Sequence, residues 1–317
     1  MAELVVFKAN ELAVSRYDLT EHETKLILFC VAKLNPTYEE PTEFQRTVKF
    51  TCSEYANFME LSYENAWGRL NAATSDLFKR SVELIYPTGD VSKRIFNWAE
   101  YAEFNRAEQS VTLVFSRYIV PLLFHLKRFI KYNLDHVKSF ENKYSMRVYE
   151  WLLKELTQRK THRANIEIGI DEFKFMLMLE TKYKEFKTLN RDVLKPVMTD
   201  MNSYSNMKLD IGKRGRPADT LIFQCELDKK VDFTKEFQEA IPDNTHIDKP
   251  KADSEILIQD LKKLLLSIEE SRTQLNSFEH KFLIDMKSKY ELNGSFSWLS
   301  PKQSQTLTKI LAKYRHI

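Results

Sequence analysis

The apolar and polar positions in the first 130 residues predict a run of helices and short strands. Two capping boxes predict helix starts, because in each a threonine hydroxyl can accept from the third backbone amide while a glutamate reaches back. They are formed by Thr20 with Glu23 and by Thr51 with Glu54. Runs rich in Val, Ile, Leu and Phe predict strands at residues 4–7, 48–50, 82–86, 94–98 and 111–115. Helix, strand, helix, helix and β-hairpin is the order of a winged helix, with the hairpin around residues 88–90 as its wing.

The third helix of this set is predicted to begin at Ser62, a residue type that favours the N-cap position. Small and apolar residues recur on its inner face at helical spacing. They are Ala66, Leu70, Ala73 and Leu77. The outer face carries short side chains, so a DNA backbone could approach it closely. We therefore take Asn71, Ser75 and Lys79 as auxiliary DNA contacts.

The same order of elements is repeated in the central part of the chain. A long amphipathic helix is predicted first, then a short strand, a helix, a second helix and a β-hairpin. The ranges are residues 144–156, 166–168, from 171, 184–202, and 207–211 with 220–227. Two copies of one plan predict an α+β chain with two tandem winged-helix domains, at residues 1–130 and 131–240.

The last part of the chain is predicted to be a linker followed by a helical tail. Residues 241–254 are polar and interrupted by proline, whereas residues 255–317 contain helical patterns. Residues 256–268 form an apolar helix in this prediction, and Ser300 followed by Pro301 marks the start of a final helix that ends near Tyr314. Packing of this tail against the main body is favoured over docking to a partner.

The helix predicted at residues 184–202 has two contrasting faces. Apolar side chains line one face, at Phe186, Leu189, Val193, Val197 and Met201. Cationic and polar side chains line the other, at Lys184, Thr188, Arg191, Lys195 and Asn202. An ordinary solvated face is the alternative, but such faces usually mix charges of both signs. Pro196 lies inside the helix and is expected to kink it or to shift its start.

The distribution of charge supports a polyanionic partner for this central region. The net charge of the chain is only +3. Residues 127–216, however, contain 20 Lys and Arg against 12 Asp and Glu, whereas residues 1–126 contain 13 against 17. A local cationic surplus raises affinity for phosphate through counterion release. The sequence therefore predicts duplex DNA as the partner of the central region.

Other classes of protein are disfavoured by the sequence. No apolar run approaches the ~18 residues of a membrane span, and the amino terminus lacks the regions of a signal peptide, so we expect a cytoplasmic protein and no membrane partner. Cys30, Cys52 and Cys225 have no metal-ligand spacing and are expected to be reduced, buried thiols. The seven His are scattered, and no glycine-rich phosphate loop occurs. We expect no enzyme activity, no catalytic residue, no cofactor and no metal.

Several sequence blocks resemble the iteron-binding plasmid replication initiators of the Rep_3 type. The blocks are Ser15-Arg16-Tyr17-Asp18-Leu19-Thr20 with Glu23, Lys25 and Leu26; Phe129, Tyr132 and Leu134; Tyr144-Ser145-Met146-Arg147-Val148-Tyr149-Glu150; Phe186-Lys187 with Val193-Leu194, Pro196 and Met201-Asn202; and Lys213-Arg214-Gly215-Arg216-Pro217 before Leu221-Ile222-Phe223. They are in family order and span about residues 4–225. The tail lies outside the resemblance.

The resemblance implies a function in plasmid DNA replication. Members of the family bind direct repeats, called iterons, at a replication origin as monomers, and repress their own promoter as dimers. A host initiator ATPase and the replicative helicase then act, so the initiator itself needs no active site. The resemblance also implies that the first domain holds the dimer interface, whereas the second makes the main base contacts. A winged-helix transcriptional repressor without a replication role and a nickase with a tyrosine nucleophile are the alternatives.

Carried onto this chain, the resemblance assigns roles to the basic residues. Lys187, Arg191 and Lys195 would enter the major groove or contact its walls, and Lys184 and Thr188 are further DNA-binding candidates. Arg191 is expected to contact guanine, because its planar fork matches the O6 and N7 acceptors. The wing would place three cations on phosphate or in a narrow minor groove, and they are Lys213, Arg214 and Arg216.

Arg147 is a cation in a family block for which we predict no DNA contact. It lies on a helix that is expected to be packed. We therefore predict a structural role, in which Arg147 pairs with Glu150 or Glu141.

Overall fold

The computed structural model describes residues 4–86, 88–231, 261, 276–293 and 301–314. These residues fall into two compact units. One comprises the described residues of 1–41 and 46–245, and the other those of 42–45 and 246–317. The predicted linker at residues 241–254, Ser300, and all but Leu261 of the helix expected at residues 256–268 lie outside the described residues.

The first winged helix contains three helices and a three-stranded sheet. The helices are α2 (Glu21–Val31), α3 (Cys52–Met59) and α4 (Tyr63–Leu77), and the strands are β2 (Thr47–Thr51), β5 (Ala99–Asn105) and β6 (Ser110–Phe115). Both predicted capping boxes are present, at Thr20 before α2 and at Thr51 before α3. Ser62 stands at the N-cap of α4 as predicted, although its side chain makes no capping hydrogen bond.

The wing of this domain differs from the hairpin predicted from the sequence. The strands predicted at residues 82–86 and 94–98 form a separate antiparallel pair, β3 (Ser81–Ile85) with β4 (Lys93–Asn97). The sheet of the winged helix has the order β2-β6-β5, so its hairpin is β5–β6. We did not predict β5 as a strand, and a β-bulge between Ala99 and Tyr101 interrupts its register with β6. Bulges of this kind break the period-2 pattern by which strands are recognised.

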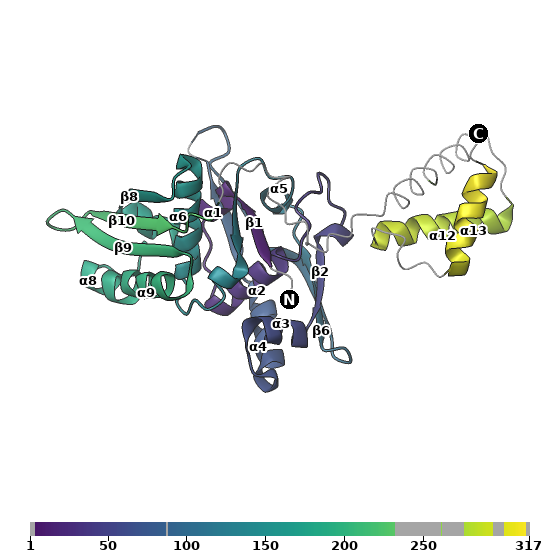
Figure 1. Cartoon of the computed structure of the whole chain (residues 1–317), viewed down its shortest axis with the longest axis horizontal. Helices are drawn as coiled ribbons and strands as arrows, with labels where there is room; N and C mark the ends of the chain where they lie inside the picture. Colours follow the sequence, from purple (N-terminus) through teal and green to yellow (C-terminus); the bar gives the residue numbers. More distant parts are fainter. Residues whose placement is uncertain (1–3, 87, 232–260, 262–275, 294–300, 315–317) are drawn as a thin grey trace. The chain divides into compact units, whose positions relative to one another are not determined.

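The second winged helix repeats the arrangement of the first. Its elements are α6 (Ser145–Arg159), β8 (Arg163–Gly169), α7 (Ile170–Met176), α8 (Phe186–Leu189), a π-helical segment η3 (Asn190–Leu194), α9 (Lys195–Tyr204), β9 (Met207–Arg214) and β10 (Thr220–Leu227). The sheet order β8-β10-β9 corresponds strand for strand to β2-β6-β5. The predicted α+β architecture with two tandem winged helices is therefore confirmed (Figure 1).

Four short helical segments and a further strand pair lie outside the two winged helices. β1 (Val5–Ala9) pairs with β7 (Phe129–Asn133), a strand that we did not predict. The short segments are α1 (Asn10–Val14), η1 (Phe44–Arg46), α5 (Val120–Leu123) and η2 (Leu134–His136). Of these, η1 begins within residues 42–45 of the other unit. α6 contacts α1 and β7 of the first domain and α9 and β8 of the second. The predicted boundary between residues 130 and 131 stays a prediction, because α6 packs on both domains.

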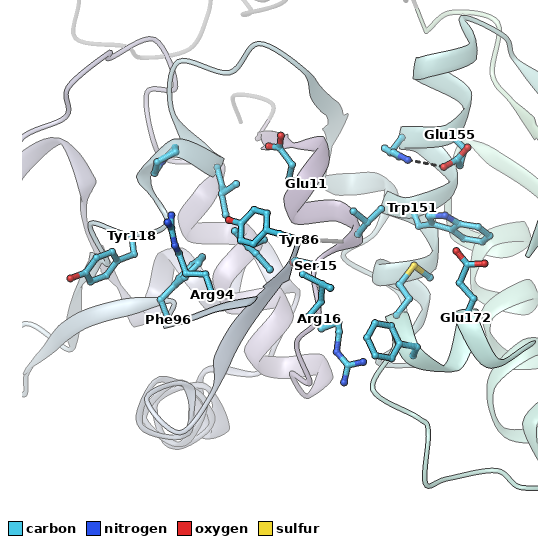
Figure 2. A pocket seen from close by; sticks show the side chains of 18 of the residues that line it. Glu11, Ser15, Arg16, Tyr86, Arg94, Phe96, Tyr118, Trp151, Glu155 and Glu172 are labelled. Carbon is cyan, nitrogen blue, oxygen red and sulfur yellow. Dashed lines mark hydrogen bonds and ion pairs between the residues drawn. The ribbon is translucent and has the colours of Figure 1, made fainter. Parts of the chain in front are cut away.

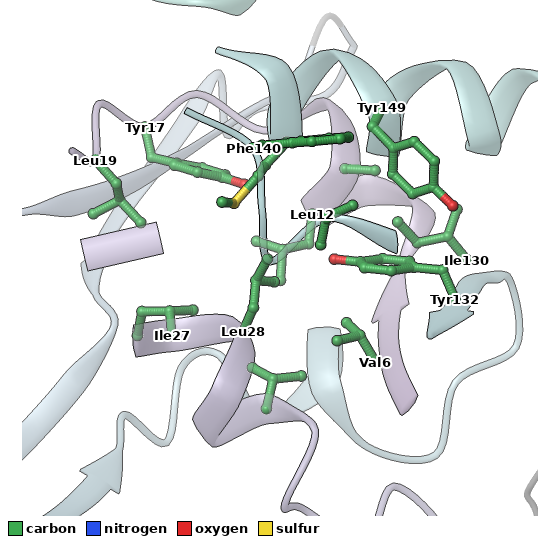
Figure 3. Packing of buried hydrophobic residues seen from close by; sticks show 14 of the residues in the cluster. Val6, Leu12, Tyr17, Leu19, Ile27, Leu28, Ile130, Tyr132, Phe140 and Tyr149 are labelled. Carbon is green, nitrogen blue, oxygen red and sulfur yellow. The ribbon is translucent and has the colours of Figure 1, made fainter. Parts of the chain in front are cut away.

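A continuous hydrophobic core joins the first domain to α6. Figure 3 shows Tyr17, Phe140 and Tyr149 packed around Leu12, with Tyr132 beside them. Within this core the Nζ of Lys8 lies 2.7 Å from a carboxylate oxygen of Glu150, and both side chains are fully buried. The hydroxyl of Tyr132 also donates to Glu150, at 2.5 Å. The buried charges are therefore paired and hydrogen-bonded, as a low-dielectric interior requires.

Arg147 has a structural role but not with the predicted partners. Its guanidinium is buried and donates to three backbone carbonyl oxygens, those of Ser15, Tyr17 at 2.8 Å and Met176 at 3.3 Å. It also stacks on the ring of Tyr17, 3.7 Å from the centroid. The prediction that it pairs with Glu150 or Glu141 is wrong, because Lys8 occupies the Glu150 carboxylate.

The described part of the tail contains two helices. α12 (Ser277–Asn293) was not predicted, whereas α13 (Pro301–Lys313) starts at the predicted proline and ends one residue before Tyr314. Glu279 in α12 accepts from Lys313 at 2.7 Å and from the hydroxyl of Tyr314 at 2.9 Å. This contact ties the end of α13 to the start of α12. No helix in the described residues has the length and apolar character to cross a bilayer.

Candidate nucleic-acid interface

The proposed recognition helix runs without a break from Phe186 to Tyr204. It passes from α8 through the π-helical segment η3 into α9, and the amide of Lys195 donates to the carbonyl of Asn190 in a π-type hydrogen bond. The irregularity near Pro196 is this π-helical segment, rather than the kink or the shifted helix start that we predicted. Pro196 has no N–H to donate to Asp192, four residues earlier, and the π-helical segment ends directly before the first turn that contains this proline.

The inner face of this helix agrees with the prediction. Leu189, Val193, Val197 and Met201 are buried in the core of the second domain, and Phe186 is half-buried. The helical period therefore persists through the π-helical segment closely enough to keep the apolar side chains on one side. The opposite side is free for solvent or a ligand.

Three cations project from the exposed side of the recognition helix. Lys187, Arg191 and Lys195 are exposed, and among the described residues neither lysine has an ion-pair partner. Lys184 is exposed too but lies in the loop before α8, not on the helix as predicted. The hydroxyl of Thr188 donates to the carbonyl of Glu185 at 2.7 Å, which occupies its only donor in this structure.

Asn202 is not part of the exposed face. Its side-chain amide donates to the carbonyl of Leu209 at 2.8 Å, and its side-chain oxygen accepts from the amide of the same residue at 3.0 Å. This two-way bond fastens α9 to β9. The placement of Asn202 among the outward polar groups was therefore wrong.

Arg191 carries a partner that the sequence analysis overlooked. Its Nε and Nη2 donate to the two carboxylate oxygens of Asp192, at 2.5 and 2.8 Å. The exposed face is thus not of one sign, because a carboxylate lies beside its central arginine. Arg191 lowers the pKa of Asp192 below its ordinary value through these hydrogen bonds. An ion pair in full contact with water is weak and screened by salt, so a phosphate or a base edge can replace it.

The hairpin β9–β10 forms a wing beside the start of this helix. In Figure 1 its tip and α8 lie at the same end of the unit. The Nζ of Lys213 lies 4.5 Å from the centroid of the Phe186 ring, a cation–π contact between wing and helix. Gly215 forms the tip with φ at +97°, and a Cβ there would lie 2.6 Å from the carbonyl oxygen of Pro217. The turn therefore requires glycine.

The two arginines of the wing differ in their surroundings. Arg214 donates to both carboxylate oxygens of Glu167 on β8, at 2.9 and 2.6 Å. Its pKa is raised by these hydrogen bonds, and that of Glu167 is lowered. Arg216 is exposed and has no such partner among the described residues. Arg214 is thus held on the sheet, whereas Arg216 can move toward a ligand.

The auxiliary contacts proposed on α4 are only partly free. The side-chain amide of Asn71 donates to the carbonyl of Trp67 at 2.9 Å, and Lys79 pairs with Asp76 at 2.6 Å. Ser75 is exposed. Lys79 lies in the turn after α4, not on the helix as predicted. Among the described residues this surface is much less cationic than the recognition helix.

Two expectations from the sequence concern clusters of metal-ligand side chains and the state of the cysteines. No group of three or more His, Cys, Asp or Glu side chains among them could hold a metal ion. The three cysteines are free and buried. Burial raises the pKa of the Cys225 thiol to about 11, so this group stays protonated near neutral pH.

Comparisons with known proteins agree with this architecture. Residues 5–153 match the family described as "Initiator Replication protein, WH1", and residues 169–225 match "Initiator Rep protein, WH2". A protein from Escherichia coli named "Replication initiation protein" is 59% identical over 319 residues, covering 100% of both chains. The crystal structure of Pi initiator protein in complex with iteron DNA is similar in fold, with a TM-score of 0.59 at 18% identity. It covers 72% of this chain and 98% of the Pi chain. The chain therefore belongs to the family of initiator replication proteins with two winged-helix domains.

Proposed function

We propose that this protein initiates plasmid replication by binding repeated duplex sites at an origin. The observation that carries the proposal is the shared placement of two cationic elements at one end of the second winged helix. The recognition helix supplies Lys187, Arg191 and Lys195, and the wing supplies Lys213 and Arg216. An exposed helix flanked by a basic hairpin suits a major groove and the adjacent phosphates.

Base recognition is assigned mainly to Arg191. On binding, its guanidinium would exchange the carboxylate of Asp192 for O6 and N7 of a guanine, because both are bidentate acceptors. Lys187 and Lys195 lie one turn before and one turn after it and would contact the walls of the groove. The negative charge of Asp192 would repel any phosphate that Arg191 approaches, which would lower the affinity of the protein for non-specific DNA.

The wing would position the protein rather than read the sequence. Lys213 and Arg216 are proposed to bind phosphates. Arg214 would instead hold the tip of the hairpin in place through its ion pair with Glu167 of β8. Phosphate contacts of this kind fix register and add to salt dependence without discriminating bases. Asn71 and Ser75 of α4 and Lys79 of the turn after it would add weaker contacts.

The remaining parts of the proposal rest on the family and on the full-length relative. That relative is named a replication initiation protein, which favours initiation over a winged-helix repressor without a replication role. We propose that a dimer of this chain represses its own promoter and that the host initiator ATPase and replicative helicase act after origin binding. In this scheme the protein is a cytoplasmic DNA-binding factor that performs no catalytic step.

A plasmid test separates initiation from repression. A plasmid that carries the origin but lacks the gene is supplied with the protein from a second replicon. Wild-type protein is expected to maintain the plasmid, and the variant K187A/R191A/K195A is expected to lose it. The variant E21Q/E108Q is the control, because it changes two ion pairs within the first domain, those with Lys25 and Lys49. Repression of the promoter without plasmid maintenance by wild-type protein would contradict the proposal.

A further inference from the structure

The segment Ser15–Asp18 is one of the sequence blocks to which DNA binding assigns no role. It connects α1 to α2 and is firmly attached to the first domain. The backbone of Arg16 forms two hydrogen bonds with Glu83 of β3, at 2.9 and 2.7 Å. The ring of Tyr17 packs edge-on against Trp98, with centroids 5.1 Å apart. The position of this segment within the first domain is therefore well defined.

Two side chains of the same segment reach across to the second domain. The guanidinium of Arg16 stacks on Phe175 of α7, 3.7 Å from the ring centroid, and its Nη1 lies 2.7 Å from Glu180. A carboxylate oxygen of Asp18 lies 3.9 Å from the Nζ of Lys182. Glu180 and Lys182 belong to the loop between α7 and α8. These contacts therefore act on the residues that lead directly into the recognition helix.

A second route joins the segment to the far half of the recognition helix. Asp18 accepts from Lys143 at 2.7 Å, and Lys143 lies in the connector before α6. The backbone amides of residues 141 and 142 donate to Asp200 of α9, at 3.1 and 2.9 Å, and the hydroxyl of Ser145 donates to it at 2.6 Å. The segment Ser15–Asp18 thus contacts elements that hold both ends of the helix.

The space beside this segment is not filled by protein. A cavity of about 650 Å³ lies between the two domains, with Arg16 at its edge. Figure 2 shows Tyr86, Arg94 and Tyr118 of the first domain on one side, and Trp151 of α6 and Glu172 of α7 on the other. Apolar contact across this part of the junction is therefore incomplete. The polar contacts at the edge of the cavity must therefore contribute a larger share of the free energy that holds the two domains in one relative orientation.

We infer that Ser15–Asp18 is a positioning segment that sets the spacing and angle between α4 and the recognition helix. In this inference Arg16 and Asp18 do not contact DNA. They determine how far apart two DNA segments can be if the two domains are to bind them at the same time. The inference rests on the proposed function. Once the second domain is bound, the contacts of Arg16 and Asp18 hold the first domain close to its own DNA segment. Loosening these contacts should lower the effective concentration of the first domain at that DNA by about tenfold.

The test is a distance measurement on the full chain without DNA. Spin labels are placed at Glu103→Cys on β5 and Gln224→Cys on β10, two exposed positions, while the native cysteines are buried. The variant D18N/E180Q removes both carboxylates that cross the junction, and their side chains are 36% and 41% exposed, so the fold should persist. E21Q/E108Q is the matched control, with the same change in charge and with ion pairs that lie within the first domain. R16Q is a stronger second variant.

The labelled chain is mixed with an excess of unlabelled chain, so that dimers contribute no distances between subunits. The expected result is then a single narrow distance distribution in wild-type and control protein and a broadened or shifted one in D18N/E180Q. On origin DNA, hydroxyl-radical protection over the segment read by the second domain should persist, while that over the first domain's segment should need about tenfold more protein. An unchanged distance distribution in both D18N/E180Q and R16Q overturns the inference. A failure of all forms to protect the repeats would instead overturn the proposed function, because the distances are measured without DNA.

Discussion

The side-chain amide of Asn142 donates a hydrogen bond of 3.3 Å to the carbonyl oxygen of Asp192. This oxygen is the one that Pro196 deprives of its usual helical donor, since proline has no N–H four residues later. A residue of the connector thus satisfies a backbone group inside the recognition helix. The bond explains how a helix with an internal proline stays continuous across the surface proposed to contact DNA.

This relationship predicts a coupling between Asn142 and Pro196. N142A should lower the free energy of unfolding by about 1–2 kcal/mol, because it leaves the Asp192 carbonyl without a donor. In the background of P196A the cost should be smaller, since the new backbone N–H can donate to the same carbonyl. Urea unfolding of the four proteins in the cycle measures the coupling. Strictly additive effects would show that the Asn142 bond does not compensate for the proline.

Arg191 and Lys213 should differ in how they affect DNA specificity. R191A is expected to weaken binding to the origin repeat by about 1–3 kcal/mol and to leave non-specific DNA nearly unchanged. K213A should weaken binding to all sequences alike and reduce the salt slope by about 1. Both are measured by fluorescence anisotropy on repeat and scrambled duplexes over a range of salt. Equal binding of both variants and wild type to the repeat would exclude the proposed contact surface.

Asp192 should act as a brake on non-specific binding. D192N frees the guanidinium of Arg191 and removes one negative charge, so affinity for scrambled duplex should rise by about two- to fivefold at low salt. E185Q is the control, because it removes a nearby exposed charge without releasing an arginine. The ratio of repeat to scrambled affinity should fall in D192N alone. A similar change in both variants would show that the effect comes from net charge alone and not from the release of Arg191.

The buried pair of Lys8 and Glu150 predicts an asymmetric response to mutation. K8M alone should destabilise the protein by about 3–5 kcal/mol, because it leaves a buried carboxylate without its cation. K8M/E150L should recover most of this loss, since neither charge of the pair remains. Thermal unfolding and urea titration of both proteins test the prediction. Equal destabilisation of the single and double variants would mean that packing, not charge, determines the cost.

The same pair predicts loss of stability at alkaline pH. Burial alone would lower the pKa of Lys8, but Glu150 and Tyr17 raise it above its ordinary value. Burial also raises the pKa of Tyr132, with Glu150 adding to the effect. Groups with raised folded pKa values contribute stability that is fully present below the unfolded values of about 10 and is lost as pH rises through the folded ones. Urea midpoints between pH 8 and 11 should therefore fall above about pH 10, and less steeply in K8M/E150L.

Local patterns in the sequence were sufficient for much of the fold and for the cationic elements. The capping boxes at Thr20 and Thr51, the apolar face from Leu189 to Met201 and the strand at β10 all depend on residues within a few positions of one another. Helical and strand periodicities extend over that range, so they can be recognised in the sequence without knowledge of the tertiary structure. The exposure of Lys187, Arg191 and Lys195 follows from the same periodicity.

Contacts between distant residues were decided only in three dimensions. Arg147 binds carbonyls 130 and 132 residues away rather than the acids near it, and Arg214 meets Glu167 across 47 residues. β5 and the role of Ser15–Asp18 depend on a bulge and on a junction between domains, neither of which has a periodic signature. The chain alone determines which faces are apolar and where helices start, because those are set by neighbouring residues. Which charges remain free for DNA is decided by tertiary structure, because folding brings a carboxylate to some cations, such as Arg214, and among the described residues brings none to others, such as Arg216.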